Sequence, residues 1–112
     1  MTPSVDIFTD AWQTAEDIRA GRVTSVEVVT QSLALIHDLQ PALNAFTIVL
    51  DESALASARA ADEAVRRGGR LPPLLGVPVS VKDHIWMVGA PATNGSLILR
   101  DFVPPEDAVP VA

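Results

Sequence analysis

The sequence has no cysteine. This absence excludes a disulfide framework, a thiolate zinc site, an iron–sulfur cluster and a cysteine nucleophile. Only two histidines are present, His37 and His84, and neither has a partner at metal-ligand spacing, so we expect no metal and no cofactor. No stretch approaches the roughly 20 apolar residues that a membrane-spanning helix requires, so we expect no transmembrane segment.

Basic residues are also scarce. The chain has 8 lysine and arginine residues against 14 aspartate and glutamate residues, which gives a formal net charge of −6 at pH 7. Surfaces that bind phosphates need the opposite sign, so direct nucleic-acid binding and binding to an anionic membrane are both disfavoured. The residues up to Trp12 include Asp6 and Asp10 but no lysine or arginine, which is unlike a secretory signal peptide. The default expectation is a soluble cytoplasmic protein.

What is present is typical of one globular domain at most: 112 residues, of which 48% are apolar and 20% are charged. The first predicted helix is short and lies within residues 10–20. It begins either at a Thr14 cap or nearer Asp10, and Gly21 is a plausible left-handed stop.

A capping box predicts the start of a second helix, because Thr24 can accept a hydrogen bond from the Glu27 amide while Glu27 reaches back. We expect Pro41 to end this helix. Apolar side chains at three- and four-residue steps indicate one buried face. They are Val26, Val29, Leu33, Ile36 and Leu39 or Gln40.

The third predicted helix runs from an Asp51 cap to Gly68 and Gly69. Small residues form a narrow stripe suited to close packing, namely Ala54, Ala58, Ala61 and Val65. Charged residues are spaced four apart on the outer face, as Arg59 with Glu63, Asp62 with Arg66, and Glu63 with Arg67. Such pairs contribute only about 0.2–0.5 kcal/mol each, so we interpret this face as solvated surface and not as an anion site.

Residues 45–50 and 76–82 are predicted strands, because they are almost continuously apolar and alternate with the helices. This pattern predicts an α/β fold with a mostly parallel sheet covered on both faces. Two strands do not close such a sheet, and residues 107–112 resemble a helix start capped by Asp107. We therefore interpret residues 1–112 as the incomplete N-terminal part of a larger α/β domain.

Lys82 is the only lysine, whereas arginine occurs seven times. It follows the predicted strand and precedes a loop rich in glycine and proline. Open α/β sheets place their sites at the carboxyl ends of strands, and burial can remove a proton from lysine but not from arginine. Lys82 is therefore a candidate general base or proton shuttle. On composition and spacing alone, a solvated charge at the end of a strand is the commoner interpretation.

The segment from Gly76 to Asp83 reads Gly-Val-Pro-Val-Ser-Val-Lys-Asp. Residues 20–27 and 41–46 precede it, and residues 89–96 and 101–108 follow it. In order and spacing, these segments resemble the N-terminal third or less of the amidase signature family, and the segment around Lys82 is the most specific part of the resemblance.

The resemblance implies a large mixed sheet surrounded by helices. It also implies a catalytic triad of a serine nucleophile, a second serine beside a cis peptide bond, and a lysine that falls on Lys82. In the family's mechanism the neutral lysine draws a proton through the bridging serine, and the nucleophilic serine attacks an amide carbonyl. The implied partner is a small-molecule amide substrate, with a homodimer or partner subunits as the assemblies to consider.

The two family serines belong to a Gly/Ser-rich segment that is not among these residues. Ser80 and Ser96 lack a Gly-Ser-Ser-Gly context, so we expect neither to be a nucleophile and we expect this chain alone to be inactive. The pair Asn94-Gly95 is explained by turn chemistry. His84 is expected to be structural or exposed.

Departures from the family pattern are Ala92, Asn94 and Trp86. These positions are expected near the mouth of the pocket, so we expect the departures to alter substrate preference. They leave the lysine at position 82 unchanged. Trp12 and Trp86 are expected to be packing anchors, and Trp86 has the better chance of lining substrate.

Three functions stay open. A stand-alone amide hydrolase is favoured over an amidotransferase A-type subunit in transfer-RNA-dependent amidation, because residues 84–87 and Asn94 look less like that subunit. The third is a non-catalytic remnant or interaction fragment, in which a partner would complete the exposed edges of an unfinished sheet.

Overall fold

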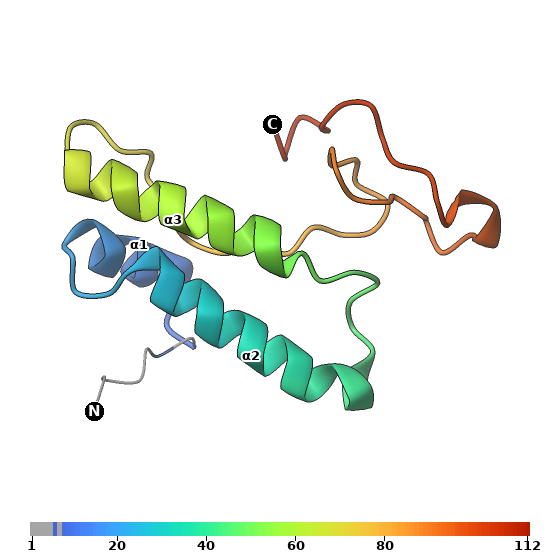
Figure 1. Ribbon diagram of the computed structural model, residues 1–112, viewed down its shortest axis with the longest axis horizontal. Coiled ribbons are helices and arrows are strands. Elements are labelled where there is room, and N and C mark those ends of the chain that lie inside the picture. The colour runs from blue at the N-terminus through green and yellow to red at the C-terminus, as the bar shows by residue number, and fades with distance from the viewer. Residues whose placement is uncertain (1–5, 7) are drawn as a thin grey trace. The chain divides into compact units, whose positions relative to one another are not determined.

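The computed structural model describes residue 6 and residues 8–112, so the expectation about a signal peptide lies largely outside the described residues. It contains three α-helices and one 3₁₀-helix: α1 (Ala11–Arg19), α2 (Ser25–Leu43), α3 (Asp51–Arg67) and η1 (Leu97–Leu99) (Figure 1). The chain divides into two compact units, Met1–Pro78 and Val79–Ala112. No helix in the described part of the chain combines the length and apolarity needed to cross a membrane.

Helix α1 starts after Asp10, whose carboxylate accepts a hydrogen bond from the Gln13 amide at 2.8 Å. This confirms the start near Asp10 and not the alternative cap at Thr14. Gly21 follows the helix with a φ of +73°, the left-handed conformation that glycine adopts without a steric cost. Trp12 lies in the first turn and is 61% exposed, so the expectation that it anchors packing is wrong for the described residues.

Side chains satisfy the backbone amides at the N-terminus of α2. The predicted capping box is confirmed: the Thr24 amide donates to the Glu27 carboxylate, and the Glu27 amide donates to the Thr24 hydroxyl. The Ser25 and Val26 amides donate to the two carboxylate oxygens of Asp62, at 2.6 and 3.1 Å. A carboxylate at a helix N-terminus is stabilising because these amides otherwise lack partners and the helix dipole favours negative charge.

The expectation that the charged residues on the outer face of α3 are all solvated is therefore wrong for Asp62. It reaches across to α2 and does not belong to a solvated row of charges. Glu63 and Arg66 form an exposed ion pair at 2.6 Å, at a spacing of three residues instead of the four that we expected; its exposure agrees with a solvated surface.

The C-terminus of α2 also differs from the prediction, because Pro41 lies inside the helix and Leu43 is its last residue. Proline in a final turn removes one amide donor but leaves the following turn able to close. Asn44 closes it in a left-handed conformation, with its amide donating to the Gln40 carbonyl at 2.8 Å. The Gln40 side chain then binds the Phe46 carbonyl and amide at 2.6 and 3.2 Å, which fixes the exit of the chain.

Helices α2 and α3 run antiparallel and side by side (Figure 1). Asp51 is the first residue of α3 and not its cap, and its carboxylate contacts the His37 ring at 2.6 Å. The predicted small-residue stripe is confirmed where Ala58 and Ala61 are buried. Small side chains on α3 allow the two helices to approach closely. The other buried apolar residues of this unit include Ala15, Ile18, Val28 and Val29.

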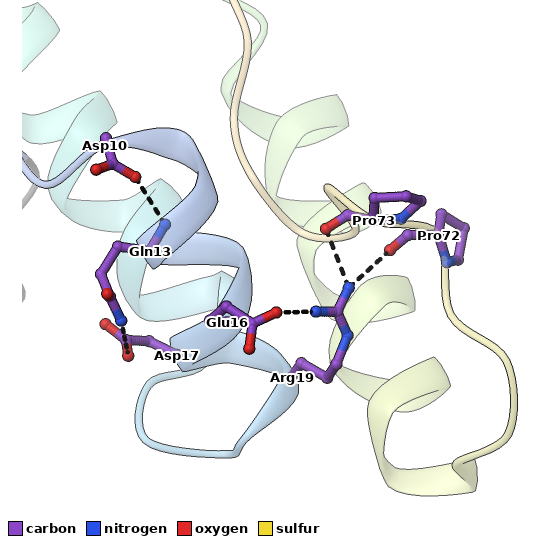
Figure 2. Close-up of polar contacts among 7 residues, drawn as sticks. All are labelled: Asp10, Gln13, Glu16, Asp17, Arg19, Pro72 and Pro73. Carbon is purple, nitrogen blue, oxygen red and sulfur yellow. Dashed lines mark hydrogen bonds and ion pairs between the residues drawn. The ribbon is translucent and has the colours of Figure 1, made fainter.

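Arg19 attaches the proline-rich loop to α1 (Figure 2). One guanidinium nitrogen donates to the carbonyls of Pro73 and Pro72, at 3.0 and 3.4 Å, and the other pairs with Glu16. The planar guanidinium suits this arrangement because its donors form a fixed fork. Arg19 therefore fixes residues 72 and 73 of this loop against α1, a few residues before Gly76.

Gly76 lies against a fully buried side chain of this unit. Ser25 is 0% exposed, and its hydroxyl donates to the Gly76 carbonyl at 2.7 Å. Gly76 has a φ of +85°, and a Cβ at this position would lie 3.0 Å from the Ser25 Cβ and 3.3 Å from Ile18. Glycine is required here by both backbone conformation and space.

The predicted strands at 45–50 and 76–82 are absent, and no strand occurs among the residues that the structure describes. A strand needs a second strand to accept its backbone hydrogen bonds, and neither segment has such a partner. Residues 109–111 form a turn instead of the expected helix start after Asp107. The predicted α/β class is therefore visible here only through its helical part.

Candidate functional site

Lys82 lies in the second unit and is exposed. Its carbonyl accepts a hydrogen bond from the Ile85 amide at 2.9 Å, which closes a turn directly after the lysine. Its amine has no hydrogen-bond or ion-pair partner among the described residues. The backbone of this candidate base is therefore placed by local contacts, whereas its side chain is not.

Asp83 binds a loop ten residues further along the chain. One carboxylate oxygen accepts from the Thr93 amide at 3.1 Å, and the other accepts from the Thr93 hydroxyl and from the Gly95 amide at 3.4 Å. The Thr93 hydroxyl, followed by the Thr93 and Gly95 amides, lowers the pKa of Asp83 below its ordinary value. The ionised form is stabilised because every one of these donors points at the carboxylate.

The bound loop is a tight turn. The Ser96 amide donates to the Thr93 carbonyl at 2.8 Å, and Asn94 and Gly95 have φ angles of +50° and +68°. Positive φ at both central positions is the pattern of a type I′ turn, for which Asn-Gly is a preferred sequence. The turn predicted from Asn94-Gly95 is confirmed, and Ser96 starts η1 by accepting from the Ile98 amide at 3.3 Å.

Trp86 packs edge-on against Phe102, with ring centroids 5.6 Å apart and an interplanar angle of 61°. The expectation of a packing role is confirmed for this tryptophan, which stays 40% exposed. The Val88 amide donates to the Asp107 carboxylate at 2.7 Å, and the Ala108 amide donates to the Trp86 carbonyl at 2.9 Å. These contacts hold residues 86–88 to residues 102–108.

The other side chains considered from the sequence are not drawn together. His84 and Ser80 are exposed, and Ser96 serves the turn. An open depression on α2 contains neither His84 nor the two serines; it is lined by Gln31, Ala34, Leu35, His37 and Asp38. No three His, Asp or Glu side chains in the described part of the chain gather as a metal site would require.

Sequence reasoning missed the roles of Thr93 and Asp107. In the sequence Asp83 was only the last residue of the segment that begins at Gly76, whereas in the structure it binds the loop at 93–95. The available signal was weak: a threonine one residue before Asn-Gly is well placed to present both its hydroxyl and its amide on the outer side of a tight turn.

We expect the Asp83 carboxyl to titrate below the ordinary aspartate pKa of about 3.9. Because the folded state lowers this pKa, the carboxylate stabilises the folded loop above the unfolded-state pKa, and this stabilisation is lost as the pH falls through the lowered pKa. An NMR titration of the Asp83 carboxyl carbon measures the midpoint. Thr93→Val should move the midpoint upward by removing the main donor, and an unchanged midpoint would contradict this cause.

The amidase family model matches residues 27–112. The A-type component of the glutamyl-tRNA(Gln) amidotransferase of Rhodopirellula baltica is 45% identical over 97 residues, which cover 87% of this chain and 19% of that protein. AmiD of Mycobacterium tuberculosis, which is named provisionally as an amidase, is 44% identical over 100 residues, which cover 89% of this chain and 21% of that protein. The chain thus spans about one fifth of the length of the curated relatives it matches.

A solved structure is also similar to this chain. It is described as an unexpected vestigial protein complex that reveals the evolutionary origins of an s-triazine catabolic enzyme. The match has a TM-score of 0.80 at 35% identity and covers 86% of this chain and 21% of that one. Since the family model covers most of the sequence, including Lys82 and the loop at 93–95, this chain belongs to the amidase family.

Proposed function

We propose that this chain is the N-terminal segment of an amide hydrolase, in which Lys82 transfers protons within a Ser–cis-Ser–Lys triad. The observation that carries the proposal is the family match over residues 27–112, which includes the segment from Gly76 to Asp83. The turn that closes directly after Lys82 and the loop bound by Asp83 support it, because they fix the backbone on which the base is carried.

In the proposed reaction, the neutral Lys82 amine accepts a proton from the bridging serine, which takes one from the nucleophilic serine. The nucleophile attacks the amide carbonyl, and the C–N bond breaks as the proton returns from Lys82 to the departing nitrogen. This step leaves an acyl-enzyme and releases ammonia or an amine. Water then attacks the ester with the same proton relay in reverse, which releases the carboxylic acid and regenerates the serine.

A second function is favoured by the named relatives, several of which are A-type components of glutamyl-tRNA(Gln) amidotransferases. In that case the amide would be glutamine, and the released ammonia would pass to an acceptor held by partner subunits. We favour the hydrolase because residues 84–87 and Asn94 look less like that component. Overall identity does not separate the two functions, since the amidotransferase components match at 45% and 47% and AmiD at 44%.

Ammonia release by the purified full-length gene product separates these functions. A hydrolase should release ammonia from simple primary amides without any partner protein. Release from glutamine alone, dependent on added partner proteins, would establish the amidotransferase. If neither ammonia nor an amine is released from any amide under either condition, the non-catalytic interaction fragment is the surviving function.

A further inference from the structure

The hydrogen bonds of the Asp83 carboxylate all come from the turn at 93–96. This carboxylate receives the Thr93 amide, the Thr93 hydroxyl and the Gly95 amide, and the hydroxyl also accepts from the Gly95 amide at 3.3 Å. A carboxylate held by several donors from one tight turn has little freedom to rotate. Asp83 and the turn at 93–96 therefore behave as one rigid piece.

This piece is itself attached to the rest of the second unit. Ala92, which directly precedes the turn, is buried, and its amide donates to the Phe102 carbonyl at 2.9 Å. Phe102 in turn packs on Trp86. The turn at 93–96 is thus anchored on its N-terminal side and does not depend on Asp83 alone for its place.

Lys82 is joined to Asp83 by a single planar peptide, so the two Cα atoms keep a separation of about 3.8 Å. The same peptide carries the Lys82 carbonyl that accepts from the Ile85 amide. With its amine exposed and without a partner among the described residues, Lys82 is placed only through its backbone. Asp83 links this backbone to the turn at 93–96 through the Thr93 amide, the Thr93 hydroxyl and the Gly95 amide.

We propose that Asp83 is a positioning residue for the proton transfer by Lys82, acting through the turn at Thr93–Ser96. This inference rests on the proposed function. It assigns to the Asp83–Thr93 contact a role in the chemical step and not only in folding, because a displacement of the base by about 1 Å can cost 100-fold in rate.

The test compares steady-state kinetics of amide hydrolysis in the full-length gene product and its variants. Asp83→Ala and Thr93→Val should each lower kcat by about 10–100-fold, a larger factor than any change in KM, because the lost contact acts on the placement of the base. Thr93→Ser keeps the hydroxyl and should keep kcat within about threefold of the wild type. If Asp83→Ala does not fold, the kcat of Thr93→Val still tests the loss of the Asp83–Thr93 contact.

Asp107→Ala is the matched control, because Asp107 also binds a loop amide in this unit but is remote in sequence from Lys82. It should leave kcat near the wild-type value. An equal loss of kcat in Asp107→Ala and Asp83→Ala, or wild-type kcat in both Asp83→Ala and Thr93→Val, would overturn the inference. Lys82→Ala, measured in the same series, separates the two failures: if it keeps full activity, the proposed function fails as well.

Discussion

Lys82→Arg is expected to lower kcat of the full-length gene product by at least about 100-fold, nearly as much as Lys82→Ala. The guanidinium keeps a positive charge at this position but cannot release its proton at any pH at which the protein is folded. Proton transfer by a positioned side chain contributes about 10²–10⁴-fold to rate, so its loss sets the expected range. Initial rates of ammonia release measure the effect.

Arg100→Ala is a suitable control, because it removes an exposed cation from the same unit without a proposed catalytic role. It should keep activity near the wild-type value. An arginine variant that retains most of the activity would show that position 82 needs only a charge, and proton transfer by Lys82 would be refuted.

Gly76→Ala is expected to lower the free energy of unfolding by about 3 kcal/mol. A left-handed φ costs a residue with a Cβ about 1–2 kcal/mol, and overpacking a filled site costs about 1–3 kcal/mol. The new Cβ would lie 3.0 Å from the Ser25 Cβ and 3.1 Å from the Ser25 hydroxyl. Ser25 cannot yield easily, because its amide and hydroxyl are both hydrogen-bonded in a fully buried position. Urea denaturation of the gene product measures the loss.

Gly69→Ala isolates the contribution of the backbone. Gly69 has a φ of +90°, yet a Cβ there would meet no atom within 4 Å. Its substitution should therefore cost only the conformational term of about 1 kcal/mol. Equal losses in the two variants would mean that contact with Ser25 does not constrain Gly76.

Local features of the helices were predictable from the sequence. The capping box at Thr24 and Glu27 needs only four consecutive residues, and the left-handed Gly21 and the Asn94-Gly95 turn follow from backbone sterics. The stripe containing Ala58 and Ala61 follows from helical periodicity. In each case the residues that determine the structure are neighbours in the chain.

Contacts between distant residues were not predictable in the same way. Asp62 lies 37 residues from Ser25, and nothing in its own helix distinguishes it from the charges around it. The contact of Asp83 with Thr93 spans ten residues, and its donors include backbone amides that are invisible in a sequence. The prediction of strands at 45–50 and 76–82 was wrong for a related reason. An apolar segment forms a strand only when another segment lies beside it.

Lys82 shows how far the candidate site could be predicted from the sequence. Its position in the chain and the family pattern indicate a proton-transferring lysine, whereas the described residues leave it exposed. Burial is what allows a lysine to act as a base near neutral pH. The proposed role of Lys82 therefore requires surroundings for its amine that the described residues do not supply.

Chemical rescue of Lys82→Ala tests the central claim most directly. In the full-length gene product, added ethylamine should restore part of the lost amide hydrolysis, in proportion to the concentration of its uncharged form. Tetramethylammonium carries a charge but no transferable proton, so it should restore nothing. Equal restoration by the two compounds, or full activity of Lys82→Ala without either, would contradict proton transfer by Lys82.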